Sequence, residues 1–127
     1  MKKPTGKHIL IVDDAMDIQS LLEQFFSEEG YTVSKSSNGY EALRFLQSTP
    51  QLPDLILLDL MMPQMDGFQF RQLQEQDPKL ASIPIVVMTA DSNVHSSTIK
   101  IGAKGFLKKP FADLNTIATT VARHIAG

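Results

Sequence analysis

The sequence predicts one α/β domain in which helices cover both faces of a parallel sheet, forming a three-layer sandwich. Short continuous apolar runs alternate with longer amphipathic stretches along the whole chain, which is the pattern of βαβ units. The length of 127 residues, 43% of them hydrophobic, suits a single buried core and leaves no room for a second domain. We therefore expect a single domain that comprises residues 1–127.

Five short apolar runs mark the expected strands. Three of them are apolar at every position, as strands buried on both faces of a parallel sheet should be. The expected strands comprise residues 9–12, 31–33, 55–58, 85–88 and 105–107. Prolines at the edges of the elements support this division, at Pro53, Pro63, Pro84 and Pro110.

Five amphipathic stretches alternate with these runs. In most of them apolar residues recur at intervals of three and four positions, which indicates helices with one buried face. The expected helices comprise residues 15–29, 39–47, 66–75, 92–101 and 111–126. Gly30 follows the first helix in the position of a capping glycine, and Asn38-Gly39 marks the turn before the second.

The composition argues against several classes of function. The formal charge of −2 provides no overall positive field, so direct nucleic acid binding is not expected. The absence of cysteine excludes disulfide scaffolds and thiolate metal sites, and it is compatible with a reducing cytoplasm. No apolar stretch approaches the ~20 residues that span a bilayer, and the run after the basic residues 1–7 is too short for a signal peptide. We expect a cytoplasmic protein without membrane insertion.

Polar side chains follow four of the five expected strands. The first strand ends in Asp13-Asp14, the third in Asp59, the fourth in Thr89 and the fifth in Lys109. In open parallel sheets, ligands bind beyond the carboxyl ends of the strands, so these groups should share one rim. Each group has a simpler interpretation as well. The acidic pair or the threonine can cap the following helix, and a lysine before a proline is usually a solvated loop residue.

Asp59 is harder to explain as a structural residue. It closes a run of four aliphatic residues, and residues 60–63 after it give it no helix to cap. Three carboxylates at one rim would repel one another without a cation, and Mg²⁺ is typically bound by one or two carboxylates, water and a phosphate oxygen. A carboxylate oxygen is a usable nucleophile for phosphorus, and Lys109 and Thr89 offer donors for the transferred oxygens. The rim therefore predicts phosphoryl transfer assisted by Mg²⁺.

These motifs resemble those of the receiver domains of two-component response regulators, over residues 9 to about 125. The matching segments are residues 11–14, 57–63, 65–67, 87–90 and 102–111, in the family's order. The resemblance implies a flavodoxin-like fold with five parallel strands in the order 2-1-3-4-5. It implies a phosphorylation-dependent signalling switch and not a conventional enzyme. Such a switch catalyses only its own phosphoryl acceptance and slow dephosphorylation.

The resemblance also implies roles for the acidic residues. Asp59 would accept a phosphoryl group from a histidine kinase or a histidine phosphotransfer protein. Asp13 and Asp14 would bind Mg²⁺ together with Asp59 and the backbone carbonyl of Met61. Direct ligation would fall mainly to Asp14 and Asp59, with Asp13 acting through water.

The remaining family residues would couple phosphorylation to a downstream effector protein. Lys109 would pair with the phosphoryl oxygens, and its peptide bond to Pro110 would be cis. Thr89 would swing toward the phosphoryl group, and Phe106 would turn inward behind it, although an ordinary core aromatic is the simpler interpretation of Phe106. The surface formed by the fourth helix, fifth strand and fifth helix would then change shape.

Other interpretations are weaker or stay open. An aspartyl phosphohydrolase would carry a second acid where this chain has Met61. A flavin carrier would carry a phosphate-binding loop after the first strand, where this chain has two aspartates. A degenerate receiver would lack one of the functional residues, all of which are present here. His8, His95 and His124 show no ligand spacing, so we interpret them as incidental. Met61 and Asp91 occupy the positions that tune phosphoryl lifetime in the family, and we expect Asp91 to have the larger effect on this lifetime. The final helix reaches the end without a linker, which favours a stand-alone regulator.

Overall fold

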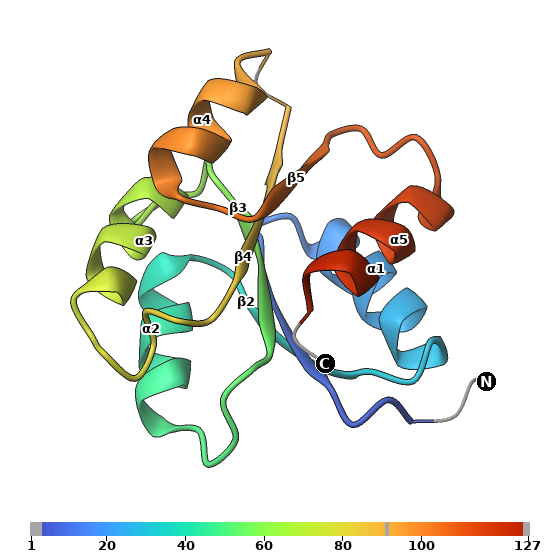
Figure 1. Ribbon diagram of the computed structural model, residues 1–127, viewed down its shortest axis with the longest axis horizontal. Helices are drawn as coiled ribbons and strands as arrows, with labels where there is room; N and C mark the ends of the chain where they lie inside the picture. Colours follow the sequence, from blue (N-terminus) through green and yellow to red (C-terminus); the bar gives the residue numbers. More distant parts are fainter. Residues whose placement is uncertain (1–3, 91, 126–127) are drawn as a thin grey trace.

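The computed structural model describes residues 4–90 and 92–125, and it contains the expected three-layer α/β sandwich (Figure 1). A five-stranded parallel sheet has the order β2-β1-β3-β4-β5, which confirms the predicted order. The strands are β1 (His8–Val12), β2 (Thr32–Ser36), β3 (Leu55–Asp59), β4 (Ile85–Thr89) and β5 (Gly105–Lys108). The helices are α1 (Met16–Glu28), α2 (Gly39–Ser48), α3 (Gly67–Glu75), α4 (Val94–Ile101) and α5 (Leu114–His124).

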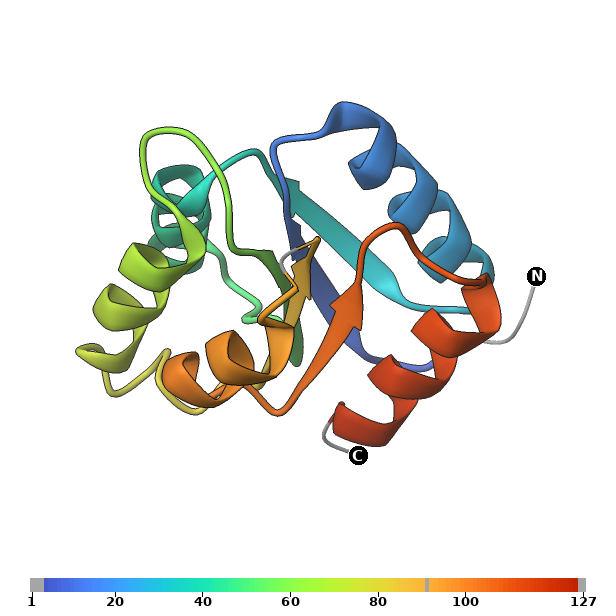
Figure 2. The ribbon, with the colours of Figure 1, turned by 90° about the horizontal axis from the view of Figure 1, so that it is seen from above.

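The helices divide between the two faces of the sheet. α1 and α5 cover one face, and α2, α3 and α4 cover the other, as both views show (Figures 1 and 2). Two hydrophobic clusters follow from this division, because successive side chains of a strand point to opposite faces. On β1, for example, Leu10 and Val12 join the cluster under α2 to α4, whereas Ile9 and Ile11 join the cluster under α1 and α5. The fully apolar runs that predicted the strands are thus explained by burial on both faces.

Three element boundaries differ from the expectation by more than one residue, and the expected end of the last helix, residue 126, lies outside the described residues. β2 continues to Ser36, beyond the expected end at residue 33, because an edge strand can expose polar side chains such as that of Lys35. α5 begins at Leu114 and not at residue 111, since Asp113 caps the helix by accepting a hydrogen bond from the Thr116 N–H at 2.6 Å. α4 begins at Val94, two residues later than expected.

The register of the strands brings their carboxyl ends to one rim. Val12 pairs with Leu58, so the next residues along β1 and β3 are Asp13 and Asp59. Thr89 pairs with Lys108 across β4 and β5.

Among the described residues, no helix is both long enough and apolar enough to cross a membrane.

Candidate functional site

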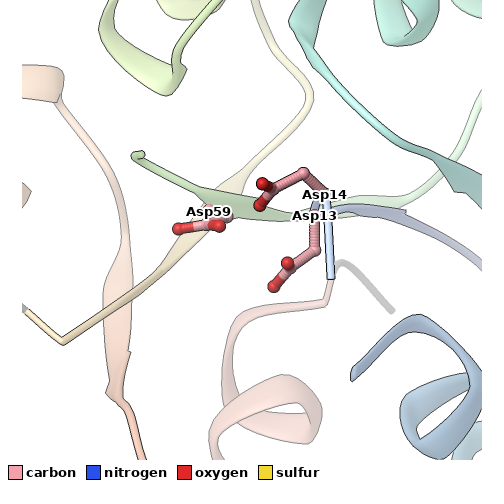
Figure 3. A group of neighbouring side chains, drawn as sticks. All are labelled: Asp13, Asp14 and Asp59. Atoms are coloured by element: carbon pink, nitrogen blue, oxygen red, sulfur yellow. The ribbon is translucent and has the colours of Figure 1, made fainter. Parts of the chain in front are cut away.

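Three carboxylates meet at the rim, at the carboxyl ends of β1 and β3 (Figure 3). Asp13, Asp14 and Asp59 each have an oxygen within 4.8 Å of the others, and they form the group of side chains in the described part of the chain that could hold a metal ion. Asp13 and Asp59 are buried, whereas Asp14 is exposed. Oxygen ligands of this kind suit a hard divalent cation.

Asp13 is held on both sides of its carboxylate. Oδ1 accepts a hydrogen bond from the Ala15 N–H at 2.9 Å, and Oδ2 lies 2.6 Å from the Lys109 ammonium. The N-cap of α1 is Ala15, which makes no side-chain capping bond. The acidic pair therefore does not cap α1, and the simpler interpretation of these residues is wrong.

Asp59 is the last residue of β3 and is only 5% exposed. Oδ1 accepts a hydrogen bond from the Met61 N–H at 3.3 Å, and Oδ2 lies 3.5 Å from the Lys109 ammonium. Burial raises the pKa of Asp59 to about 6, and the charge of Asp13 adds to the shift, whereas Lys109 and the Met61 N–H oppose it. The ionised form is therefore disfavoured here, and a cation bound beside it would be stabilising.

Lys109 brings positive charge to the two buried acids. Burial acts to lower the pKa of Lys109, but its hydrogen bond to Asp13 and the charges of Asp13 and Asp59 outweigh burial and raise the pKa. The side chain therefore stays protonated at neutral pH. Its backbone N–H donates to the Thr89 carbonyl at 2.9 Å, which fixes it beside β4, and the Lys109–Pro110 peptide bond is cis.

The carboxylate of Asp59 opens into a surface pocket of about 420 Å³. Met61, Thr89, Ala90 and Lys109 complete its lining. Thr89 is buried as the last residue of β4, and α4 has Asn93 as its N-cap, so Thr89 does not cap that helix. Met61 is 72% exposed at the rim of this pocket. A nucleophilic oxygen, an ammonium group and a hydroxyl residue thus border one space that a phosphoryl group can enter.

Phe106 lies on β5, half-buried against the cluster that includes the side chains of α2, α3 and α4. Its ring packs edge to face with the ring of His95 on α4, with the ring centroids 4.6 Å apart. Sequence reasoning treated His95 as incidental and missed this contact, because the residues are eleven positions apart and no motif links them. Asp91, which we expected to tune phosphoryl lifetime, lies outside the described residues.

The other two histidines lie away from the acidic cluster. His8 starts β1 at the opposite end of the sheet, where its Nε2 lies 2.7 Å from the Ser34 hydroxyl. Burial lowers the pKa of His8, against the influence of the Asp54 charge and nearby backbone groups. The ring of His124 packs over Gly105, where an added Cβ would lie 2.8 Å from Nε2. Neither residue joins the acidic cluster of Asp13, Asp14 and Asp59 found in residues 4–90 and 92–125.

Sequence reasoning also missed Gln19. It lies on α1 beside Leu22 and Phe26, is 3% exposed, and donates from its side-chain amide to the backbone carbonyls of Asp13 and Ser36. A signal was present in the sequence, because a glutamine three positions before Leu22 and seven before Phe26 interrupts an apolar stripe.

Comparison with known proteins agrees with this geometry. The family model of the response regulator receiver domain matches residues 9–122, so the chain belongs to this family. The response regulator SaeR of Staphylococcus epidermidis is 33% identical over 115 residues, which cover 89% of this chain and 48% of SaeR. SaeR of Staphylococcus aureus is 34% identical over 107 residues, covering 83% of this chain and 45% of SaeR. The chain thus spans about half the length of the curated relatives it matches.

Solved structures show the same architecture. The chemotaxis protein CheY4 of Vibrio cholerae superimposes with a TM-score of 0.84 at 29% identity, covering 94% of this chain and 98% of CheY4. The response regulator TrrA of Thermotoga maritima, crystallised in complex with Mg²⁺-BeF, superimposes with a TM-score of 0.80 at 30% identity. That match covers 94% of this chain and 99% of TrrA.

Proposed function

We propose that this receiver domain is a phosphorylation-dependent switch in which Asp59 accepts a phosphoryl group from a histidine kinase or histidine phosphotransfer protein. The observation that carries the proposal is the placement of Asp59, whose carboxylate opens into a pocket beside two further acids and 3.5 Å from Lys109. A buried carboxylate with a raised pKa is unfavourable for folding in its ionised form, but it suits nucleophilic attack.

The donor set of the acidic cluster fits Mg²⁺. Three carboxylates within 4.8 Å give hard oxygen ligands, and their mutual repulsion favours a divalent cation. Asp14, Asp59 and the backbone carbonyl of Met61 would hold the ion directly, and Asp13 would hold it through water. The complex of TrrA with Mg²⁺-BeF supports the choice of Mg²⁺ as the ion. When bound, the ion supplies positive charge that offsets repulsion between carboxylate and phosphoryl oxygens.

The transfer itself is a displacement at phosphorus. A carboxylate oxygen of Asp59 attacks the phosphorus of a phosphohistidine, a P–O bond forms, and the P–N bond breaks with its electron pair passing to the imidazole nitrogen, which takes up a proton. Lys109 and the Thr89 hydroxyl donate hydrogen bonds to the phosphoryl oxygens and stabilise the added charge. Slow dephosphorylation is the attack of water on the same phosphorus, with the Asp59 carboxylate as leaving group. Asp91 and Met61 would screen or orient that water.

The signal would leave through the surface of α4, β5 and α5. When Thr89 turns toward the phosphoryl group, Phe106 can fill the space behind it, and Phe106 already contacts His95 of α4. A groove of about 430 Å³ crosses this surface beside Phe106 and includes the cationic side chains Lys104 and Arg123, together with His124. An effector with an acidic segment would be favoured at such a groove by charge complementarity.

Binding of beryllofluoride, a noncovalent mimic of a phosphoryl group, tests the proposal. We expect backbone amide NMR signals of the rim residues and of Phe106 to shift saturably with beryllofluoride in the presence of Mg²⁺, and not with either component alone. The Asp59→Asn variant should show no such shifts. Absence of saturable shifts in the wild type would favour a domain that binds partners without phosphorylation.

A further inference from the structure

Gln19 contacts the backbone of Asp13, whereas Lys109 contacts the side chain of the same residue. Its side-chain amide nitrogen donates to the carbonyl of Asp13 and, at 3.3 Å, to both the carbonyl of Ser36 and the hydroxyl of Ser37. The side chain is only 3% exposed, so these bonds lie in a region from which water is largely excluded. One buried amide thus joins α1 to the ends of β1 and β2.

The backbone of Asp13 is consequently fixed at two atoms. Its N–H donates to the Ser36 carbonyl at 3.1 Å, and its carbonyl accepts from Gln19. The side chain of Asp13 contacts Lys109 at 2.6 Å, and the exposed Asp14 follows directly. The direction in which both carboxylates face Asp59 therefore depends on how this short stretch of backbone is held.

We propose that Gln19 is a positioning residue for the magnesium site. By holding the Asp13 backbone against Ser36, it sets the positions from which Asp13 and Asp14 meet the cation. This inference rests on the proposed Mg²⁺ binding at Asp13, Asp14 and Asp59. Metal affinity is sensitive to such support, because residues that orient ligands without touching the ion commonly change affinity by about 10- to 100-fold when replaced.

An apolar residue of similar size at this position would remove the Gln19 donor from the buried carbonyl of Asp13 and would leave the Ser36 carbonyl with the Asp13 N–H as its donor. A buried carbonyl that loses its donor regains hydrogen bonds by moving toward water or toward other donors. The backbone of Asp13 would therefore shift, and the carboxylates would no longer be presented to a cation in one arrangement. If Gln19 merely filled space in the core, its replacement by an apolar residue of similar size would not affect the metal site.

The chain offers a matched control for this test. Gln74 on α3 is also fully buried, and its amide likewise donates to two backbone carbonyls, those of Leu80 and Ile83, at 2.8 and 3.2 Å. These carbonyls belong to the connection before β4, away from the rim. Gln19→Met and Gln74→Met both remove buried amide-to-carbonyl bonds, and the second also removes a bond from Arg71 to the Gln74 side-chain oxygen at 3.0 Å, but only the first removes bonds from the acidic loop.

Mg²⁺ titrations of the wild type and both variants, followed by NMR or calorimetry, decide the matter. We expect Gln19→Met to raise the Mg²⁺ dissociation constant by about tenfold, whereas Gln74→Met should leave it within about twofold, although both lower the melting temperature. Equal dissociation constants in the two variants would overturn the role of Gln19. Absence of Mg²⁺ binding in the wild type would instead overturn the metal site on which the inference rests.

The wild type provides a second test if Gln19→Met does not fold. Linkage is reciprocal, so a bond that favours metal binding must itself be strengthened by the metal. We therefore expect Mg²⁺ to slow hydrogen exchange at the Gln19 side-chain amide and at the Asp13 N–H. The Gln74 amide should not respond. Equal responses at the two glutamines, or no response at Gln19, would overturn the proposal.

Discussion

The ammonium group of Lys109 forms its shorter ion pair, 2.6 Å, with Asp13 and not with Asp59, from which it lies 3.5 Å away. The lysine is thus held mainly by an acid that would not itself be phosphorylated. It still lowers the pKa of Asp59 at this distance, although burial and the charge of Asp13 keep that pKa at about 6. The balance of charge around Asp59 leads to specific predictions.

Removal of the Lys109 charge should raise the pKa of Asp59 above about 6, because the ammonium stabilises the ionised carboxylate. The measurement is a ¹³C carboxyl NMR titration of Lys109→Met without Mg²⁺. Lys108→Met is the matched control, since Lys108 is the preceding residue and its side chain is exposed. An unchanged pKa of Asp59 in Lys109→Met would show that the lysine does not act on it.

Asp59→Asn should stabilise the protein without Mg²⁺ above pH 6. The folded pKa of about 6 lies above the ordinary value of 3.8, so the folded state binds the proton more tightly than the unfolded state. The Asp59 contribution to stability is therefore present below about pH 4 and is lost as the pH rises through 6. At pH 7.5 the asparagine variant should gain about 1 to 2 kcal/mol in free energy of unfolding after allowance for solvent screening.

Urea unfolding between pH 4 and pH 8 tests this pH dependence. The difference between Asp59→Asn and the wild type should grow from about pH 4 and become constant above about pH 7. Mg²⁺ should reduce the difference at pH 7.5, because it binds the ionised wild-type site. A difference that shrinks as the pH rises would contradict the raised pKa of Asp59.

Gly67→Ala should disturb the end of β3. A Cβ at Gly67 would lie 2.8 Å from the Asp59 carbonyl oxygen and 2.9 Å from the Leu60 Cα, and backbone atoms cannot easily yield. We expect a loss of about 1 to 3 kcal/mol in the free energy of unfolding, together with NMR shifts at Asp59.

Gly102→Ala is the control for Gly67→Ala. Gly102 has a φ of 73°, so alanine there should cost about 1 to 2 kcal/mol through its backbone conformation. Its added Cβ would approach only the end of the Arg71 side chain, at 3.5 Å. The control should destabilise the fold without moving the Asp59 signals. Equal shifts at Asp59 in both variants would argue against a local effect of Gly67.

Thr89→Ala should separate phosphorylation from signalling. The variant retains Asp59 and Lys109, so it should still bind beryllofluoride with Mg²⁺ and show NMR shifts at the rim. The shifts at Phe106 and along α4 should be absent or much smaller, because the threonine hydroxyl is the proposed link between them. Thr119→Ala, at an exposed position on α5, should behave as the wild type. Full shifts at Phe106 in Thr89→Ala would rule out this coupling.

Sequence reasoning identified the elements whose chemistry is local. The runs at β1, β3 and β4 are apolar at successive positions because both of their faces are covered, and that pattern is visible without a structure. The acids at the strand ends were found for the same reason, since each follows such a run directly. The predicted strand at β2 ended too early, because the second half of β2 lies at a sheet edge and is polar. Its residues, which include Ser34 and Lys35, do not differ from a loop in composition.

Features that depend on distant contacts could not be predicted in this way. The role of Gln19 depends on Ser36 and Ser37, which reach it only after the chain has turned at the end of α1. The contact of His95 with Phe106 depends on how α4 packs against β5. The capping alternative for the acidic pair was resolved only by the position of Ala15. In each case the sequence showed the residue type but not the residue that it contacts in the folded protein.

The most direct test of the central claim is phosphorylation of Asp59 by a small-molecule phosphodonor such as acetyl phosphate, read by intact mass with and without Mg²⁺. Asp77→Asn is a suitable control beside Asp59→Asn, because Asp77 lies in the loop after α3. We predict that the wild type and Asp77→Asn gain one phosphoryl group only with Mg²⁺, and that Asp59→Asn gains none. A phosphoryl group on Asp59→Asn, or none on the wild type where another receiver domain is modified, would contradict the account.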